Sequence, residues 1–162
     1  MTVRLKRPSW DEYFINLAKV VKTRADCLRR QVGSVIVKDF RIISTGYNGT
    51  PHKIKNCSQG GCLRCKKRDK GEINWYEYEE SCICIHAEQN AICQAAKLGI
   101  SIEGATLYCR MTPCRTCAMI IINSGITRVV VERKYQRGQE SEEMFKQASV
   151  ELVIINDELQ KY

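Results

Sequence analysis

The chain has 162 residues and a mass of 18.6 kDa, and 44% of its residues are hydrophobic while 27% are charged. This length and balance exclude fibrous, disordered and multidomain architectures and predict a single domain over residues 1–162. No apolar run reaches the roughly 20 residues of a membrane span, and the opening residues 1–7 lead into no signal peptide. We therefore expect a cytoplasmic protein.

The formal net charge of +8 is unevenly distributed along the chain. Residues 1–70 carry 17 basic and 5 acidic side chains, whereas residues 71–162 carry 9 and 13. The basic excess of the N-terminal part indicates an anionic ligand, either a nucleotide or a nucleic acid, or else a solvated surface that aids solubility. Charge alone does not distinguish these options.

The first half of the chain predicts a helix, a hairpin and a long polar insertion. Ser9 and Glu12 form a capping box that begins a helix with one apolar face. Residues 31–37 and 41–47 are two β-branched, apolar runs separated by three residues, the spacing of a hairpin. The segment 52–81 is too long and too polar for an ordinary loop, and its cysteines suggest that an internal cross-link holds it together.

The second half alternates helices and strands. Helical spacing runs from residue 87 to Gly99 and from residue 114 to 123, before Gly125, and a third helix is predicted over 141–148. Strands are predicted over 106–109, 128–131 and 150–155. This alternation predicts an α/β fold whose crossovers cover both faces of a sheet.

Two short motifs carry the chemistry. His86 and Glu88 flank one alanine, and Pro113 precedes the pair Cys114 and Cys117. Alone, a Cys-x-x-Cys pair is typical of a redox pair or half a zinc finger. Together the imidazole and two thiolates supply three ligands of a tetrahedral zinc, and the fourth position is left for water, as in a catalytic site. A structural zinc would need a fourth protein ligand. Glu88 is then the candidate proton carrier, since it need not bind the metal.

His-x-Glu followed by Pro-Cys-x-x-Cys is the signature of zinc nucleobase deaminases. The segments 27–37, 44–51, 86–92 and 102–108 extend this similarity over nearly the whole chain, which resembles deoxycytidylate (dCMP) deaminases of bacterial and phage type. The resemblance implies a cytidine-deaminase-like, three-layer α/β/α fold with a mixed, roughly five-stranded central sheet. It also implies that dCMP and water are converted to dUMP, which feeds dTMP synthesis, and ammonia. In that reaction a zinc-bound hydroxide attacks C4 while Glu88 shuttles protons.

The resemblance also suggests substrate contacts and regulation. The residues implied or proposed for substrate binding are Asn48, Ala87, Thr112, Arg30, Arg115 and Tyr135, with Arg24 and Arg29 as further candidates for the 5′-phosphate. Asn48 is alternatively a turn residue of positive φ, and Tyr135 a packed side chain. The family is commonly homohexameric, activated by dCTP and inhibited by dTTP with Mg²⁺. Lys97 lies where the family places a regulatory basic residue, although a cation at a helix C-terminus needs no effector.

The other cysteines raise the question of a second metal. The positions that align with a structural zinc of the family are Cys27, Cys57, Cys62 and Cys82, which would anchor the polar insertion. Cys65, Cys84 and His52 are further possible ligands, so the quartet is not unique. Cys93 and Cys109 are expected to be buried small apolar residues.

Two alternative functions are retained. A tRNA adenosine deaminase, or another nucleotide deaminase, shares the two motifs and would suit the basic N-terminal half, but it accounts less well for the Gly-Tyr-Asn-Gly turn and the cysteine-bearing insertion. A non-catalytic zinc module that binds nucleic acid would leave the His86-x-Glu88 motif unexplained. We therefore expect a small nucleotide as the ligand, with no membrane or nucleic-acid partner.

Overall fold

The computed structural model describes residues 7–74 and 82–160, and its centre is a mixed five-stranded sheet in the order β2-β1-β3-β4-β5. The strands are β1 (Gly33–Lys38), β2 (Arg41–Tyr47), β3 (Thr106–Met111), β4 (Arg128–Tyr135) and β5 (Glu151–Gln160). The α-helices are α1 (Trp10–Val21), α2 (Leu63–Asp69), α3 (Ala87–Lys97), α4 (Arg115–Asn123) and α5 (Gln139–Gln147), and the short 3₁₀ turns are η1 (Lys22–Arg24) and η2 (Cys57–Gln59). The predicted α/β class and mixed sheet are confirmed.

The strand directions bring the loops that carry the motifs to one edge of the sheet. β1 is antiparallel to both β2 and β3, while β3, β4 and β5 are mutually parallel. The carboxyl ends of β2, β3 and β4 therefore meet at the same edge. The Pro113–Cys114 segment follows β3 at this edge. There, an isolated β-bridge joins Gly49, which follows β2, to Ile85, which precedes α3.

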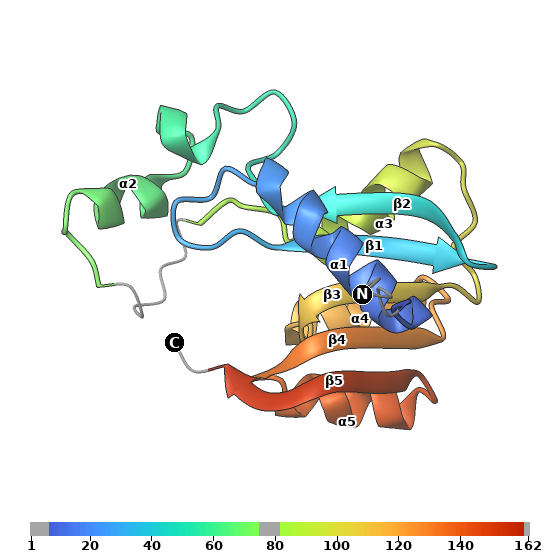
Figure 1. The fold of residues 1–162 in the computed structure, drawn as a ribbon. Coiled ribbons are helices and arrows are strands. Elements are labelled where there is room, and N and C mark those ends of the chain that lie inside the picture. The colour runs from blue at the N-terminus through green and yellow to red at the C-terminus, as the bar shows by residue number, and fades with distance from the viewer. Residues whose placement is uncertain (1–6, 75–81, 161–162) are drawn as a thin grey trace, which may run out of the picture.

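Helices cover both faces of this sheet, as Figure 1 shows with α1 on the near side and α3 and α4 behind it. The side-chain alternation of β1 explains the layers. Val35 and Val37 pack with Phe14 of α1, whereas Ile36 packs with Ala91 of α3 on the opposite face. Because both faces are buried, the central strands read as continuous apolar runs. The expected three-layer α/β/α arrangement is confirmed.

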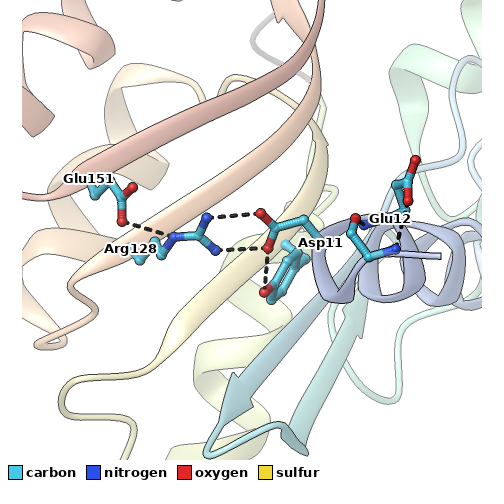
Figure 2. A network of polar contacts seen from close by, with 6 residues as sticks. Asp11, Glu12, Arg128 and Glu151 are labelled. Atoms are coloured by element: carbon cyan, nitrogen blue, oxygen red, sulfur yellow. Dashed lines mark hydrogen bonds and ion pairs between the residues drawn. The ribbon is translucent and has the colours of Figure 1, made fainter. Parts of the chain in front are cut away.

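A polar network fixes α1 to the sheet. The Arg128 guanidinium donates two hydrogen bonds of 2.9 Å to the carboxylate of Asp11, and the Tyr108 hydroxyl donates a third of 3.0 Å (Figure 2). Arg128 also donates to Glu151 of β5 at 2.9 Å. The predicted capping box is present, since the Ser9 and Glu12 side chains each accept a hydrogen bond from the other residue's backbone. The bonds of Asp11 thus join α1 to β3 and β4.

The structure differs from the sequence prediction mainly in the insertion and at the ends of the strands. Residues 63–69 form α2, for which no helix was predicted, and α2 lies to the side of the sheet (Figure 1). Strands β4 and β5 are longer than predicted because each continues in a parallel ladder with the other. The end of the predicted insertion, residues 75–81, lies outside the described residues.

Within the described ranges, none of the helices combines the length and apolar character needed to cross a bilayer.

Candidate active site

The first motif lies at the start of α3. His86 is the N-cap of this helix, and its backbone N–H donates to Gln89 Oε1 at 3.0 Å. Just before it, Ile85 exchanges backbone hydrogen bonds of 2.8 and 3.2 Å with Gly49. The bridge places the end of the Gly46–Gly49 turn directly beside His86. The helix start and the turn after β2 therefore form one local unit.

Two buried serines anchor α3 to the sheet. The Ser34 hydroxyl of β1 donates to the Ala87 carbonyl at 2.8 Å, and the Ser44 hydroxyl of β2 donates to the Ala91 carbonyl at 2.6 Å. Gly46 lets the helix approach closely, since a Cβ at this position would lie 2.2 Å from the Ala87 carbonyl oxygen. These two roles were not predicted from the sequence, although a serine inside a buried apolar strand is the signal that marks them.

The second motif meets the first in space. Cys114 is the N-cap of α4 and Cys117 lies in its first turn. Each sulfur lies 3.4 Å from His86 Nδ1, and all three atoms lie within 4.8 Å of one another. Zinc bonds of about 2.3 Å to sulfur and 2.0–2.1 Å to nitrogen require an N···S edge of about 3.6 Å in a tetrahedron. The three side chains therefore fit a zinc ion.

Hydrogen bonds and charge interactions couple the three side chains of this group. Hydrogen bonds with Cys117 and, to a smaller extent, with His86 lower the pKa of Cys114 to about 4, although burial acts in the opposite direction. The hydrogen bond with Cys114 raises the pKa of His86 to about 9. Among the described residues, no fourth possible ligand joins His86, Cys114 and Cys117. His86 is exposed, whereas Cys117 is buried. One side of the group thus remains open to water or a ligand.

Glu88 lies in the first turn of α3, beside these candidate ligands. Its side chain is only 7% exposed, and it hydrogen-bonds with Cys117. Burial raises the pKa of Glu88 above its ordinary value. The charge of the nearby His86 acts in the opposite direction but does not cancel this effect. A buried carboxyl group beside a candidate metal site can exchange protons with a water molecule or a substrate.

Asn48 joins two backbone segments at the edge of the site. Its amide oxygen accepts from Val32 N–H at 2.7 Å, and its amide nitrogen donates to the Arg30 carbonyl at 2.8 Å. Asn48 does not have positive φ, so the alternative interpretation as a left-handed turn residue is wrong. The side chain instead fixes the loop before β1, which leaves one amide hydrogen and further oxygen lone pairs for a ligand.

Thr112 and Tyr135 lie together at the carboxyl edge. The Thr112 hydroxyl accepts a hydrogen bond from Tyr135 N–H at 3.4 Å, and its backbone N–H donates to Arg133. Tyr135 is the last residue of β4, not a residue beyond the strand as predicted, because the ladder with β5 extends that far. Thr112 directly follows β3 and Tyr135 ends β4, so both lie at the carboxyl edge of the sheet.

The remaining candidates are dispersed. Ala87 is buried at the first position of α3, and Arg30 lies beside Cys27, to which its backbone donates a hydrogen bond. Arg115 is exposed on α4 and pairs with Glu140 at 3.6 Å. Lys97 is exposed in the last turn of α3, about 16 Å along the helix from His86. The structure therefore does not bring Lys97 to the site.

Six of the other eight cysteines form a separate cluster at the insertion. Its members are Cys57, Cys62 and Cys65, with Cys27, Cys82 and Cys84 packed against them. All four positions expected for a second zinc are in it, together with the additional Cys65 and Cys84, whereas His52 belongs to neither group of possible ligands there. Cys109 is buried as expected, but Cys93 is exposed because it lies on the solvent side of α3.

Comparison with known proteins identifies the family of this site. The family model for the cytidine and deoxycytidylate deaminase zinc-binding region matches residues 8–133. The chain belongs to the cytidine and deoxycytidylate deaminase family. Deoxycytidylate deaminase of Mycobacterium phage D29 is 38% identical over 134 residues, which cover 80% of this chain and 99% of the phage protein.

Two further relatives extend the comparison. Deoxycytidylate deaminase of Saccharomyces cerevisiae is 42% identical over 146 residues, or 90% of this chain and 45% of the yeast protein. The chain thus spans about half the length of the first curated relatives that it matches. The crystal structure of dCMP deaminase from cyanophage S-TIM5 with dCMP and dUMP superposes with a TM-score of 0.72 at 28% identity, covering 93% of this chain and 99% of that one.

Proposed function

We propose that this chain catalyses the hydrolytic deamination of dCMP to dUMP and ammonia, and so supplies dUMP for dTMP synthesis. One observation carries the proposal: His86, Cys114 and Cys117 converge from two helix starts while the buried Glu88 lies beside them. The similarity to a dCMP deaminase whose structure holds dCMP and dUMP supports the choice of substrate.

In this proposal the ligands of the zinc are His86, Cys114 and Cys117. When bound there, zinc lowers the pKa of a coordinated water toward neutrality and so supplies a nucleophile. Glu88 takes a proton from the attacking water and passes it to ring nitrogen N3 as the new C4–O bond forms. Glu88 then takes the second proton from the new C4 hydroxyl group and delivers it to the amino group. The C4–O bond becomes a carbonyl, the C4–N bond breaks, and ammonia leaves.

The surrounding backbone orients the pyrimidine. Ala87 is the first residue of α3, so its N–H has no partner within the helix and is available to the ring carbonyl. Asn48 holds the neighbouring turn and offers its remaining amide hydrogen to the nucleotide. Thr112 and Tyr135 close the carboxyl edge, and Arg30 and Arg115 are the candidates for the 5′-phosphate.

Regulation and assembly remain predictions from the family resemblance. They are a homohexamer, activation by dCTP, inhibition by dTTP with Mg²⁺, a role for Lys97 and a cytoplasmic location. A second, structural zinc also remains a prediction, and its four expected ligands lie within the thiol cluster.

The decisive experiment compares substrates at equal concentration. Purified, zinc-loaded protein is incubated with dCMP, dCTP, deoxycytidine and a tRNA that carries an unmodified adenosine, and ammonia release is measured. We expect rapid release from dCMP alone. Release from tRNA alone would establish a tRNA adenosine deaminase instead, and release from another nucleotide would establish a different nucleotide deaminase. If no substrate releases ammonia while the protein binds nucleic acid, the function is that of a non-catalytic zinc module.

A further inference from the structure

The thiol cluster contains more sulfur than one metal ion can bind. Its six cysteines come from the segment before β1, from η2, from the start of α2 and from the segment before α3: Cys27, Cys57, Cys62, Cys65, Cys82 and Cys84. One tetrahedral zinc takes four thiolates. A single ion would therefore leave two thiols of the cluster without a role.

Two of these cysteines lie in the middle of the cluster. The sulfurs of Cys57 and Cys84 are 3.3 Å apart. Cys57 belongs to both groups of possible metal ligands, one with Cys27 and Cys65 and the other with Cys62 and Cys84. Cys84 likewise hydrogen-bonds with Cys27 and with Cys82. The two central sulfurs therefore contact thiols on both sides.

The other four cysteines form two outer pairs. Cys27 hydrogen-bonds with Cys65 and with the central Cys84, and Cys27 and Cys65 both lie within 4.8 Å of the central Cys57. Cys82 hydrogen-bonds with Cys62 and with the central Cys84 on the other side. Each outer pair, combined with the two central sulfurs, makes a set of four. Adding Cys84 to the group of Cys27, Cys57 and Cys65, and Cys82 to the group of Cys57, Cys62 and Cys84, gives two sets of four that share Cys57 and Cys84.

We infer that this cluster binds two zinc ions bridged by Cys57 and Cys84, with Cys27 and Cys65 completing one ion and Cys62 and Cys82 the other. The arithmetic of coordination agrees with the contacts. Two tetrahedral ions need eight sulfur contacts, and six thiolates supply eight only when two of them each bind both ions. The shared pair must be adjacent, and Cys57 and Cys84 are adjacent.

Charge and ligand chemistry suit such a cluster. Soft thiolate ligands favour zinc over hard cations such as Mg²⁺. Two Zn²⁺ ions and six thiolates carry a formal charge of about −2, which a buried site must compensate. The buried Arg64 hydrogen-bonds with Cys82, and the buried Arg68 interacts electrostatically with Cys65 and Cys82. Both arginines lie on α2, so the insertion provides ligands and counter-charges together.

The inference does not depend on the proposed deaminase activity, and metal stoichiometry tests it directly. The full chain is reconstituted with zinc under reducing conditions, and native mass spectrometry counts the ions. We expect three zinc ions per chain, two in the thiol cluster and one at His86, Cys114 and Cys117. A His86→Ala variant should keep two. A cluster that holds one ion or none in this variant would overturn the inference.

Cadmium substitution tests the bridges. With ¹¹³Cd in the His86→Ala variant, two NMR signals are expected in the range of tetrathiolate sites, with scalar coupling between them, because the bridging sulfurs connect the two nuclei. A single signal, or two uncoupled signals, would overturn the shared-edge arrangement. Both measurements use protein with an unaltered cluster, so they do not depend on the folding of a cysteine variant.

Cysteine variants then separate bridging from terminal positions. Cys84→Ser should remove both cluster ions, since each loses a ligand, whereas Cys82→Ser should remove one. Cys93→Ser is the matched control, because Cys93 is exposed on α3 and outside the cluster. Equal losses from Cys84→Ser and Cys82→Ser would contradict the assignment of Cys84 as a bridge.

Discussion

Glu88 combines burial with direct access to the candidate metal ligands. Its carboxyl group is almost fully buried and hydrogen-bonds with Cys117, yet the neighbouring His86 is exposed. We therefore predict that Glu88→Gln lowers kcat for dCMP by at least about 10²–10⁴-fold, the usual contribution of a general acid–base group. Bound zinc should remain at the wild-type level, because Glu88 is not among the ligands. Steady-state kinetics and metal analysis of the same sample measure both quantities.

Glu143→Gln is the control for this substitution. Glu143 is exposed on α5, where it accepts a hydrogen bond from Gln147, so kcat should be unchanged. A Glu88→Gln enzyme that retains wild-type activity would remove Glu88 from the mechanism. If both activity and zinc are lost, Glu88 instead maintains the metal site.

At the scale of single residues, the sequence predicts a group well when its partners are close in the chain. His86 and Glu88, or Cys114 and Cys117, are recognisable because each pair lies within one helical turn. The bonds of Asn48 are different, since they join it to backbone 16 and 18 residues away. No local pattern specifies that loop, so its structural role became evident only in the fold.

At the scale of elements, the contact between β2 and α3 determines where His86 and Glu88 lie. A Cβ on Gly46 would approach Ala87 O to 2.2 Å and Ala91 N to 2.3 Å, and both atoms belong to rigid backbone. We predict that Gly46→Ala lowers the free energy of unfolding by about 2 kcal/mol or more and displaces the start of α3. Urea denaturation and zinc retention measure these two effects.

Gly49→Ala provides a matched substitution just after β2. A Cβ on Gly49 meets nothing within 4 Å, and its backbone φ is not positive. The free energy of unfolding of the Gly49→Ala protein should therefore stay within about 1 kcal/mol of the wild-type value. Equal stability of the Gly46→Ala and Gly49→Ala proteins would show that α3 adapts freely to β2.

The ion pair between α1 and β4 predicts a pH dependence of stability. The hydrogen bond with Arg128 lowers the pKa of Asp11 below its usual 3.8. A lowered carboxyl pKa adds stability above the unfolded-state pKa, and this stability is lost as the pH falls through the folded-state pKa. Asp11→Asn should therefore lower the free energy of unfolding by about 1–2 kcal/mol at pH 7, and the difference should shrink below about pH 4.

Chemical denaturation at pH 7, 5 and 3 measures this difference. Asp39→Asn is the control, because Asp39 is exposed in the β1–β2 turn at φ 50°, a conformation that asparagine also tolerates. Its stability difference should be small and independent of pH. A constant difference between Asp11→Asn and wild type at all three pH values would show that the ion pair contributes no charge-dependent stability.

The elements themselves differ in how well the sequence predicts them. The capping box at Ser9 and the left-handed glycines Gly99 and Gly125 set helix ends that the sequence predicts correctly. Helix α2 was not predicted because its buried residues are Arg64, Cys65 and Arg68, which form no apolar stripe. Its packing partner is the thiol cluster rather than the hydrophobic core, and hydrophobic periodicity cannot detect such a partner.

At the scale of the whole molecule, the fold has two kinds of core. Apolar side chains on both faces of the sheet hold α1, α3, α4 and α5, whereas the insertion packs against the cysteine side chains of the thiol cluster. An isolated helix of seven residues is unstable in water, so α2 depends on what it packs against. Metal bound by the thiols is thus expected to stabilise the insertion and to leave the sheet nearly unaffected.

This separation predicts selective proteolysis after metal removal. Protein treated with a strong chelator and a reducing agent should be cut by trypsin first after Lys66, Lys67 or Lys70, in and just after α2, while sites in β4 such as Arg128 stay protected by the sheet. Mass spectrometry of early fragments identifies the cuts, and zinc added back should restore resistance. The Glu88→Gln protein, which keeps every thiol, should show the same pattern. Simultaneous cleavage in α2 and β4 would show that metal removal unfolds the entire domain, and an uncut insertion would show that α2 is stable without metal.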